Sequence, residues 1–382
     1  MTATRFPAVV EIGQLGRLPD TPLANGGQCE GVWVVPAAPS LLFKKYTLEV
    51  RRQTDSAALD RLIAEPSAMS RDQRRLVETA TAWPSSRVTD GGDTVGVLLP
   101  RAPDAFTVAW RSPTDVENPA RRTTLEIDLL AKPDRFLTQR AIPAQPAAER
   151  ATMCTTLARI AALFEERGLV YADWSYANAF WQPVKHEVFL LDIDGCSFGP
   201  RDYVITPNFD DPKTPPGTKV DNYTDRYRAA LLIARCLTTV RDVEPLTAAL
   251  SAMSGAAPAT LRRILVEARR DARPPLAELA AAFTGTMSPA PSTRPQDTTG
   301  VVDWVEWSPS VKRTKPAPQQ TRPARATAST SQPATPKPAP PNGSATTQQD
   351  VTAGTTAFGC GVLLFLIAAV AFGVVAVVHW LV

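Results

Sequence analysis

The order of hydrophobic and polar residues divides the chain into a long folded part and a different C-terminal part. Residues 1–285 alternate short apolar, strand-like runs with segments whose apolar residues recur at helical spacing. Residues 288–349 lack this periodicity and are dominated by Pro, Thr, Ala, Ser and Gln. Residues 358–378 then form a run of 21 residues without a charge. The pattern predicts a folded domain, a linker and an apolar C-terminal segment.

Several elements of the folded part can be placed from their periodicity. A helix is predicted over 147–167, ending at Gly168, a residue that readily takes the left-handed conformation after a helix. A Gly-punctuated hairpin is predicted at 23–35, and a strand at 41–46 has Leu42, Lys44 and Tyr46 on one face. Further segments are an amphipathic helix over 221–237 and strands over 169–174, 179–182 and 187–194.

The C-terminal part predicts a tether and a membrane anchor. Residues 286–352 cannot bury enough apolar surface to offset chain entropy, so we expect them to be disordered. As a helix, the apolar run would be about 31 Å long, close to the roughly 30 Å hydrocarbon core of a bilayer. Because it follows a disordered linker, with no domain to bury it, we predict a single transmembrane helix over 357–379.

Composition excludes several classes of protein. The 41 basic residues nearly balance the 38 acidic ones, so the chain has no overall nucleic-acid-binding charge, and no nucleic-acid partner is expected. The five cysteines and two histidines lack metal-binding spacing, which argues against a zinc site or a disulfide framework. The N-terminal residues have no apolar segment of signal-peptide length. A reducing, cytosolic environment is therefore expected for the folded domain.

Two short segments carry the candidate chemistry. Asp173 and Asn178 lie five positions apart in GLVYADWSYANAFW (168–181), and Asp192 and Asp194 end the strand pattern of EVFLLDIDGCSFG (187–199). Phosphoryl transfer from Mg-ATP needs a carboxylate to receive the proton of the acceptor hydroxyl and oxygen ligands for magnesium. Taken alone, the first segment could equally be a hairpin whose Asp and Asn cap turns.

The order of these segments resembles the catalytic loop and metal-binding aspartate of the protein-kinase-like superfamily. The resemblance implies that Asp173 is the catalytic base and that Asn178 and Asp192 bind Mg²⁺. Asp194 is expected to cap the loop or to lie behind the metal ligands, rather than to bind the metal. The resemblance also implies that Lys44 neutralises the phosphates of ATP. The remaining expected nucleotide contacts are the phosphate-facing Gly26, Gly27 and Gly31 and the adenine-facing backbone from Leu99 to Ala102.

Two later segments extend the resemblance. The helix at 221–237 is similar to the kinase helix whose buried Asp, here Asp225, braces the catalytic loop. The segment ARPPLAELAAAF (272–283) is similar to the closing helix of bacterial serine/threonine kinases, an ending that small-molecule phosphotransferases lack. The resemblance implies that Arg273 pairs with Asp210 or Asp211. It is closest to atypical, actinobacterial-type serine/threonine kinase-like proteins with a C-terminal transmembrane anchor.

The implied fold is α+β and two-lobed, with a small β-rich lobe at about 1–100 and a mainly helical lobe at about 101–285. The chain departs from typical kinases at Tyr171 and Ala172, where those have His and Arg, so no switching by loop phosphorylation is expected. The helix glutamate that would pair with Lys44 is either Glu65 or Glu78.

The resemblance predicts a membrane-anchored, ATP-dependent protein phosphotransferase for Ser/Thr, with ATP and Mg²⁺ as cofactors and an unidentified protein substrate. A nucleotide-binding pseudokinase that acts as a membrane-tethered scaffold is the alternative, and a small-molecule kinase is a third. The predicted topology is single-pass and tail-anchored in the cell membrane, with the kinase-like domain in the cytoplasm. In the linker, Trp304 and Trp307 either dock on this domain or mark a partner motif.

Overall fold

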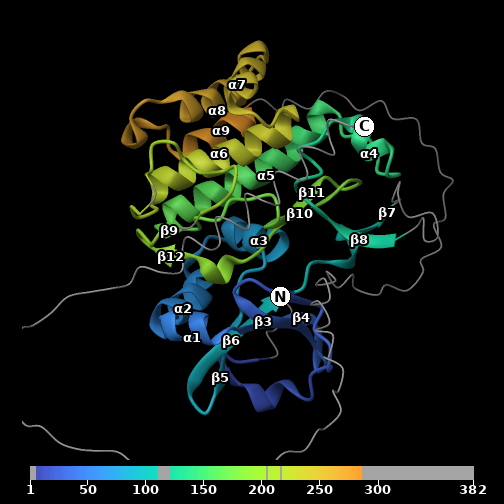
Figure 1. The fold of residues 1–382 in the computed structure, drawn as a ribbon, viewed down its shortest axis with the longest axis vertical. Coiled ribbons are helices and arrows are strands. Elements are labelled where there is room, and N and C mark those ends of the chain that lie inside the picture. The colour runs from blue at the N-terminus through green and yellow to red at the C-terminus, as the bar shows by residue number, and fades with distance from the viewer. Residues whose placement is uncertain (1–5, 111–120, 204, 216, 286–382) are drawn as a thin grey trace, which may run out of the picture. The chain divides into compact units, whose positions relative to one another are not determined.

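The structure is a computed structural model that describes residues 6–110, 121–203, 205–215 and 217–285 (Figure 1). The chain divides into two units, Met1–Lys315 and Pro316–Val382, and all described residues belong to the first. Within the described ranges, no helix is long and apolar enough to cross a membrane. The predicted linker and transmembrane helix lie outside them, as do Trp304 and Trp307.

A six-stranded sheet forms the small lobe. Phe43 and Leu98 face one side of this sheet and pack in a cluster with Val10 and Val88. Val97 and Leu99 face the other side and join the main hydrophobic core. The strands, in the spatial order β1-β5-β6-β4-β3-β2, are β1 (Val9–Glu11), β2 (Ala24–Gly26), β3 (Cys29–Val35), β4 (Ala38–Tyr46), β5 (Ser86–Asp90) and β6 (Asp93–Pro100).

Three helices lie between β4 and β5 in the chain: α1 (Leu48–Gln53), α2 (Ser56–Ala64) and α3 (Arg71–Ala80). Asp55 caps α2 by accepting from two backbone N–H groups, and Ser70 with Gln73 forms a capping box at the start of α3. The buried face of α3 packs into the main core. Just after it, the Ala82 N–H donates to the Leu190 carbonyl at 2.7 Å, which joins this region to the helical lobe.

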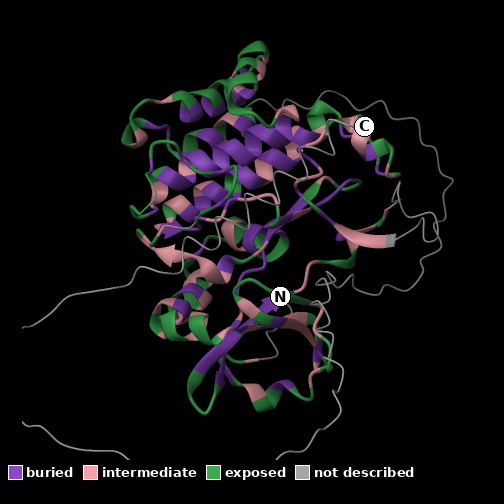
Figure 2. Ribbon diagram, viewed as in Figure 1, coloured by how far each residue is buried: buried purple, intermediate pink, exposed green. Residues whose placement is uncertain are grey.

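The helical lobe is built around two long helices, α5 (Ala147–Glu166) and α6 (Asn222–Thr238), which are the most continuously buried elements in Figure 2. Asp221 caps α6 through the Thr224 N–H, and apolar residues occupy most of its circumference. The other helices of this lobe are α4 (Asp134–Thr138), α7 (Val243–Ala252), α8 (Ala256–Val266) and α9 (Leu276–Gly285).

Within its described residues, the helical lobe also contains six short strands, which form two small sheets. A four-stranded sheet has the order β11-β10-β8-β7, in which a hairpin that the sequence did not predict, β7 and β8, extends the β10–β11 hairpin. A second small sheet pairs β9 with β12. The strands are β7 (Thr107–Trp110), β8 (Arg121–Glu126), β9 (Leu169–Val170), β10 (Ala179–Gln182), β11 (Glu187–Leu190) and β12 (Ser197–Phe198).

The described residues therefore form an α+β, two-lobed structure, as the sequence predicts. The predicted helices at 147–167 and 221–237 correspond to α5 and α6. The strand predicted over 169–174 is wrong after Val170, because the Tyr171 and Ala172 N–H groups bond to the Asp225 carboxylate instead of a neighbouring strand. The strand predicted over 187–194 ends at Leu190, since Asp192 takes a left-handed conformation with φ of 53°.

Candidate active site

Lys44 lies near the end of β4, between β3 and β6, where its backbone pairs with Val32 and Val97. Neighbouring Gly96 permits this close approach of β6, because a Cβ there would lie 2.1 Å from the Lys44 carbonyl oxygen. Lys44 and Tyr46 share a face of the strand, as its alternation requires, and both contact Asp194. Lys45 points elsewhere and pairs with Glu30 at 2.7 Å.

Two carboxylates hold the Lys44 ammonium. Its Nζ lies 3.0 Å from Asp192 Oδ1 and 3.0 Å from Asp194 Oδ2, and the lysine is only 7% exposed. Burial lowers the pKa of Lys44, but the two carboxylates more than offset this effect and leave it above its ordinary value. The Asp192 side chain is 50% exposed whereas that of Asp194 is 3% exposed, so Asp192 has the more open position.

The segment that carries Asp192 is tied to the loop that carries Asp173. The Leu191 N–H donates to the Asn178 carbonyl at 2.8 Å. The Tyr171 hydroxyl donates to the Leu191 carbonyl, also at 2.8 Å. These bonds lie on either side of Asp173 in the sequence, so the two candidate segments are held in one fixed arrangement.

The backbone before Asp173 is braced from α6. The Asp225 carboxylate accepts from the Tyr171 N–H at 2.7 Å and from the Ala172 N–H at 2.9 Å. Burial raises the pKa of Asp225 to about 7, against the opposing effect of these two bonds. Buried Arg228, one turn further along α6, donates to the Ala172 carbonyl, and Ala172 itself has φ of 65°. The left-handed residue is thus fixed from both sides by one helix.

Asp173 is half-buried, and its surroundings orient it. The Asn178 Nδ2 donates to the Asp173 carbonyl at 2.9 Å, which closes the loop between the two residues. The Thr206 hydroxyl lies 3.4 Å from Asp173 Oδ1, and Arg228 in turn donates to that hydroxyl at 3.0 Å. Asp173 therefore combines partial exposure with a defined backbone, which a residue that accepts a proton from a bound hydroxyl requires.

The residues expected to contact the nucleotide through their backbone differ in conformation and burial. Gly26 ends β2 and Gly27 begins the turn to β3, both with positive φ, a conformation that suits glycine. Gly31 lies inside β3, where a Cβ would come within 2.5 Å of the Trp33 ring, so packing accounts for this glycine. At the end of β6, Leu99 is buried and Ala102 is half-buried.

The Lys44 partner proposed from sequence is not found. Glu65 pairs with Arg167 at 3.3 Å, and Glu78 is exposed on α3. Neither glutamate has an ion pair with Lys44 in the described structure, which corrects the expectation of a helix glutamate. The physical reason is that two other carboxylates, Asp192 and Asp194, already pair with the ammonium, each at 3.0 Å.

Arg273 has the partner that the sequence left open. Its guanidinium donates to both oxygens of Asp211, at 2.6 and 2.7 Å, and both side chains are almost fully buried. Asp210 instead accepts from Arg228 at 3.1 Å and from the Tyr203 hydroxyl at 2.9 Å. The Arg273–Asp211 pair therefore joins the segment at 272–283 to residues 206–212.

The side-chain oxygens of Asp192 and Asn178 fit a magnesium ion that takes its other ligands from substrate phosphates and water. The described residues contain no cluster of three or more His, Cys, Asp or Glu side chains that could bind a metal. Mg²⁺ typically binds through one or two carboxylates, water and substrate phosphates. Half-exposed Asp192 supplies such a carboxylate, and Asn178, whose Nδ2 is bonded to Asp173, keeps its Oδ1 as a second oxygen donor.

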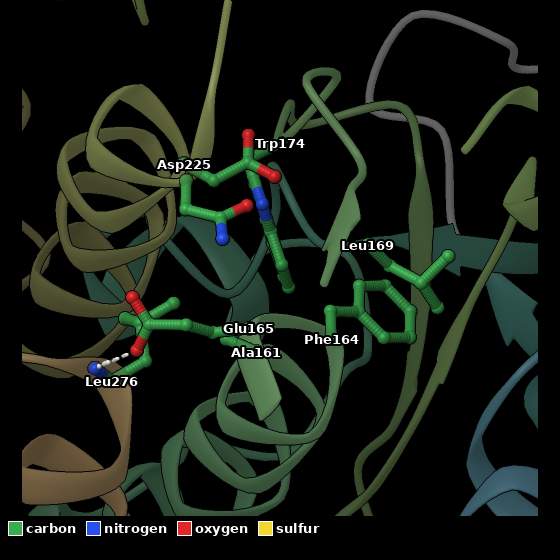
Figure 3. A pocket seen from close by; sticks show the side chains of 8 residues that line it. Ala161, Phe164, Glu165, Leu169, Trp174, Asp225 and Leu276 are labelled. Carbon is green, nitrogen blue, oxygen red and sulfur yellow. Dashed lines mark hydrogen bonds between the residues drawn. The ribbon is translucent and has the colours of Figure 1, made fainter. Parts of the chain in front are cut away.

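A shallow depression, with no room for a water molecule, lies between α5, α6 and the start of α9 (Figure 3). Trp174 and Asp225 line it, together with Phe164, and Glu165, which accepts from the Leu276 N–H at 2.7 Å. Neither Lys44, Asp173 nor Asp192 borders it. It is therefore separate from the candidate active site.

The sequence alone does not reveal the contacts that Tyr46, Arg228 and Thr206 make in this site. Tyr46 carries a detectable signal, since it lies two positions after Lys44 and so shares its strand face. Arg228 lies three positions after Asp225 and so shares its helix face. Thr206 gives no local signal, because its contact with Asp173 depends on how the intervening segment folds back.

No protein-family model matches this chain, and no curated protein matches it. Among solved structures, it is similar to the ROP18 kinase domain in complex with AMP-PNP and sucrose, at 16% identity and a TM-score of 0.43, covering 69% of this chain and 78% of that one. It is also similar to the Mycobacterium tuberculosis PknI kinase domain, at 17% identity and a TM-score of 0.42, covering 68% of this chain and 92% of that one. At these scores the likeness to either domain is weak.

Proposed function

We propose that this chain is a membrane-anchored, ATP-dependent protein phosphotransferase that acts on Ser or Thr hydroxyls. One observation carries the proposal. Lys44 Nζ lies 3.0 Å from Asp192 Oδ1, although the two residues are 148 positions apart, and the segment of Asp192 is tied by hydrogen bonds to the loop that contains Asp173. A buried lysine, an exposed carboxylate and a half-buried carboxylate on tied segments are the groups that phosphoryl transfer from Mg-ATP requires.

Each residue has a defined part in the proposal. Lys44 binds and neutralises the phosphates of ATP, with Gly26 and Gly27, where β2 turns into β3, beside them. Asp192 and Asn178 would hold Mg²⁺, which would supply positive charge to offset that of the transferred phosphoryl group. Asp173 orients the acceptor hydroxyl and receives its proton, while Asp225 and Arg228 keep the loop backbone in place. Catalysis then comes mostly from positioning and charge, as expected for this reaction class.

The test is magnesium-dependent ATP binding and phosphate transfer by the full chain. Asp192→Ala should abolish or severely weaken Mg-ATP binding. Asp173→Asn keeps the shape of the side chain but removes the base, so it should spare binding and lower transfer by roughly 10²–10⁴-fold. Asp202→Asn, at an exposed aspartate in the segment after Asp194, is the matched control and should change neither. Unchanged magnesium-dependent binding in a folded Asp192→Ala variant would overturn this site.

One observation favours a second candidate function, a nucleotide-binding scaffold without turnover. Neither Glu65 nor Glu78 contacts Lys44, so the helix partner implied by the family resemblance is missing. Wild-type chain that binds Mg-ATP well, yet transfers no phosphate to any protein substrate, would establish the scaffold and exclude the enzyme.

A further inference from the structure

Lys44 needs a fixed partner if it is to bind phosphates, because its side chain is long and flexible. Two carboxylates now contact its ammonium. Asp192 is half exposed and is the residue proposed to bind Mg²⁺, so its oxygens would be shared with the metal. Asp194 is enclosed, with 3% of its side chain exposed, and has no such second task.

Asp194 is also held from its other side. The Tyr46 hydroxyl donates to Asp194 Oδ2 at 2.9 Å, and Tyr46 lies on the same face of β4 as Lys44. The turn that carries Asp194, Ile193–Gly195, is closed by the Gly195 N–H bonding to the Asp192 carbonyl at 3.1 Å. Ile193 in this turn is fully buried. The carboxylate is therefore fixed by its own turn and by the strand that carries the lysine.

We propose that Asp194 is the residue that positions Lys44, in place of a glutamate from a helix of the small lobe. This inference rests on the proposed function, in which Lys44 binds ATP phosphates. It follows that Lys44 is oriented by the same turn that carries Asp192. The lysine and the metal-binding carboxylate are then set together, and the position of α2 or α3 does not decide whether Lys44 is in place.

The first test measures binding and transfer separately in the full chain. Asp194→Asn keeps the size of the side chain and its bond to Tyr46 but removes the charge that holds Lys44. Phosphate transfer at saturating Mg-ATP should fall by about 10- to 100-fold, the size of loss that misplacing one group by about 1 Å can cause. Mg-ATP affinity should change by a smaller factor, since Asp192 is intact. Glu78→Gln is the control and should change neither quantity.

The second test needs no enzymatic activity. NMR relaxation of ¹³Cε-labelled lysine in the full chain at pH 7 measures the mobility of the Lys44 side chain, whose signal is assigned by its absence in Lys44→Arg. In the wild type the Lys44 ammonium should be rigid, because two carboxylates each lie 3.0 Å from it. In Asp194→Asn the mobility of Lys44 should rise, because Asp192 is then the one carboxylate of the pair that still holds the ammonium.

The outcomes separate the two proposals. An unchanged mobility of Lys44 in folded Asp194→Asn overturns the positioning role, whether or not the chain transfers phosphate. A raised mobility in a chain that neither binds Mg-ATP nor transfers phosphate supports the contact and overturns the proposed function alone. If Asp194→Asn does not fold, Asp194→Ser replaces it: it also removes the charge, so the mobility of Lys44 should rise, and an unchanged mobility overturns the role.

Discussion

The buried pair of Arg273 and Asp211 gives the sharpest prediction about stability. The guanidinium donates to both carboxylate oxygens, at 2.6 and 2.7 Å, and also to the Tyr223 carbonyl at 2.8 Å. The carboxylate accepts further bonds from the Lys213 N–H and the Thr214 hydroxyl. Arg273→Met removes the cation and leaves Asp211 charged, buried and without its main partner.

The size of the loss follows from burial. Removing one member of a buried ion pair typically costs about 3–5 kcal/mol, because the other charge stays uncompensated. This is a large part of the roughly 5–15 kcal/mol that stabilises a typical folded protein. The side chains of Arg273 and Asp211 are 1% and 0% exposed, so solvent screening does not reduce the effect. Combining Arg273→Met with Asp211→Ala removes both charges and should cost less than the sum of the single changes.

The assay is urea unfolding of the full chain at pH 7, followed by tryptophan fluorescence. Arg269→Met is the matched control, since Arg269 and Asp271 form an exposed pair of similar length, 2.7 Å, and this change should leave the free energy of unfolding unaltered. Two single variants that each lose under about 1 kcal/mol, or losses that simply add in the double variant, would refute the buried pair as described.

The same pair predicts a response to acid. Burial raises the pKa of Asp211, but the bonds from Arg273, the Lys213 N–H and Thr214 more than offset it, so the folded pKa lies below the ordinary 3.8. A depressed folded pKa stabilises the protein above the unfolded pKa. This contribution should be lost as the pH falls through the folded pKa, and Asp211→Ala should remove that part of the acid-induced loss measured by unfolding.

Three other predictions concern the loop, the sheet and the topology. Because burial raises the pKa of Asp225 from 3.8 to about 7, its stabilising contribution is full below pH 3.8 and is lost as the pH rises through 7. Asp225→Asn should therefore flatten the fall in unfolding free energy across this range, and an unchanged slope would contradict it. Gly96→Ala should lower the free energy of unfolding by about 1–3 kcal/mol and weaken Mg-ATP binding, because the added Cβ would collide with the Lys44 carbonyl. An unaltered urea midpoint would contradict this close approach of the two strands. Protease added outside intact cells should leave residues 1–285 whole if the segment 357–379 anchors a cytoplasmic domain, and digestion of the domain would reverse the proposed topology.

Much of the local structure is encoded in the periodicity of the sequence. The helix α5 and the glycine that follows it, the helix α6 with Asp225 in its first turn, and the strand face shared by Lys44 and Tyr46 all follow from residue spacing. Such features depend on neighbours within a few positions, so a single sequence determines them. The spacing of Asp173, Asn178 and Asp192 likewise indicates a candidate site before any contact is known.

Which charged groups meet was decided only by the tertiary structure. Lys44 forms ion pairs with Asp192 and Asp194, and Glu65 forms one with Arg167. Arg273 forms its ion pair with Asp211 rather than Asp210. The strand predicted through Tyr171 and Ala172 also ends early, because a carboxylate from α6 takes their N–H groups. A buried charge or N–H group must find a partner, and the nearest one depends on how elements far apart in the sequence pack together.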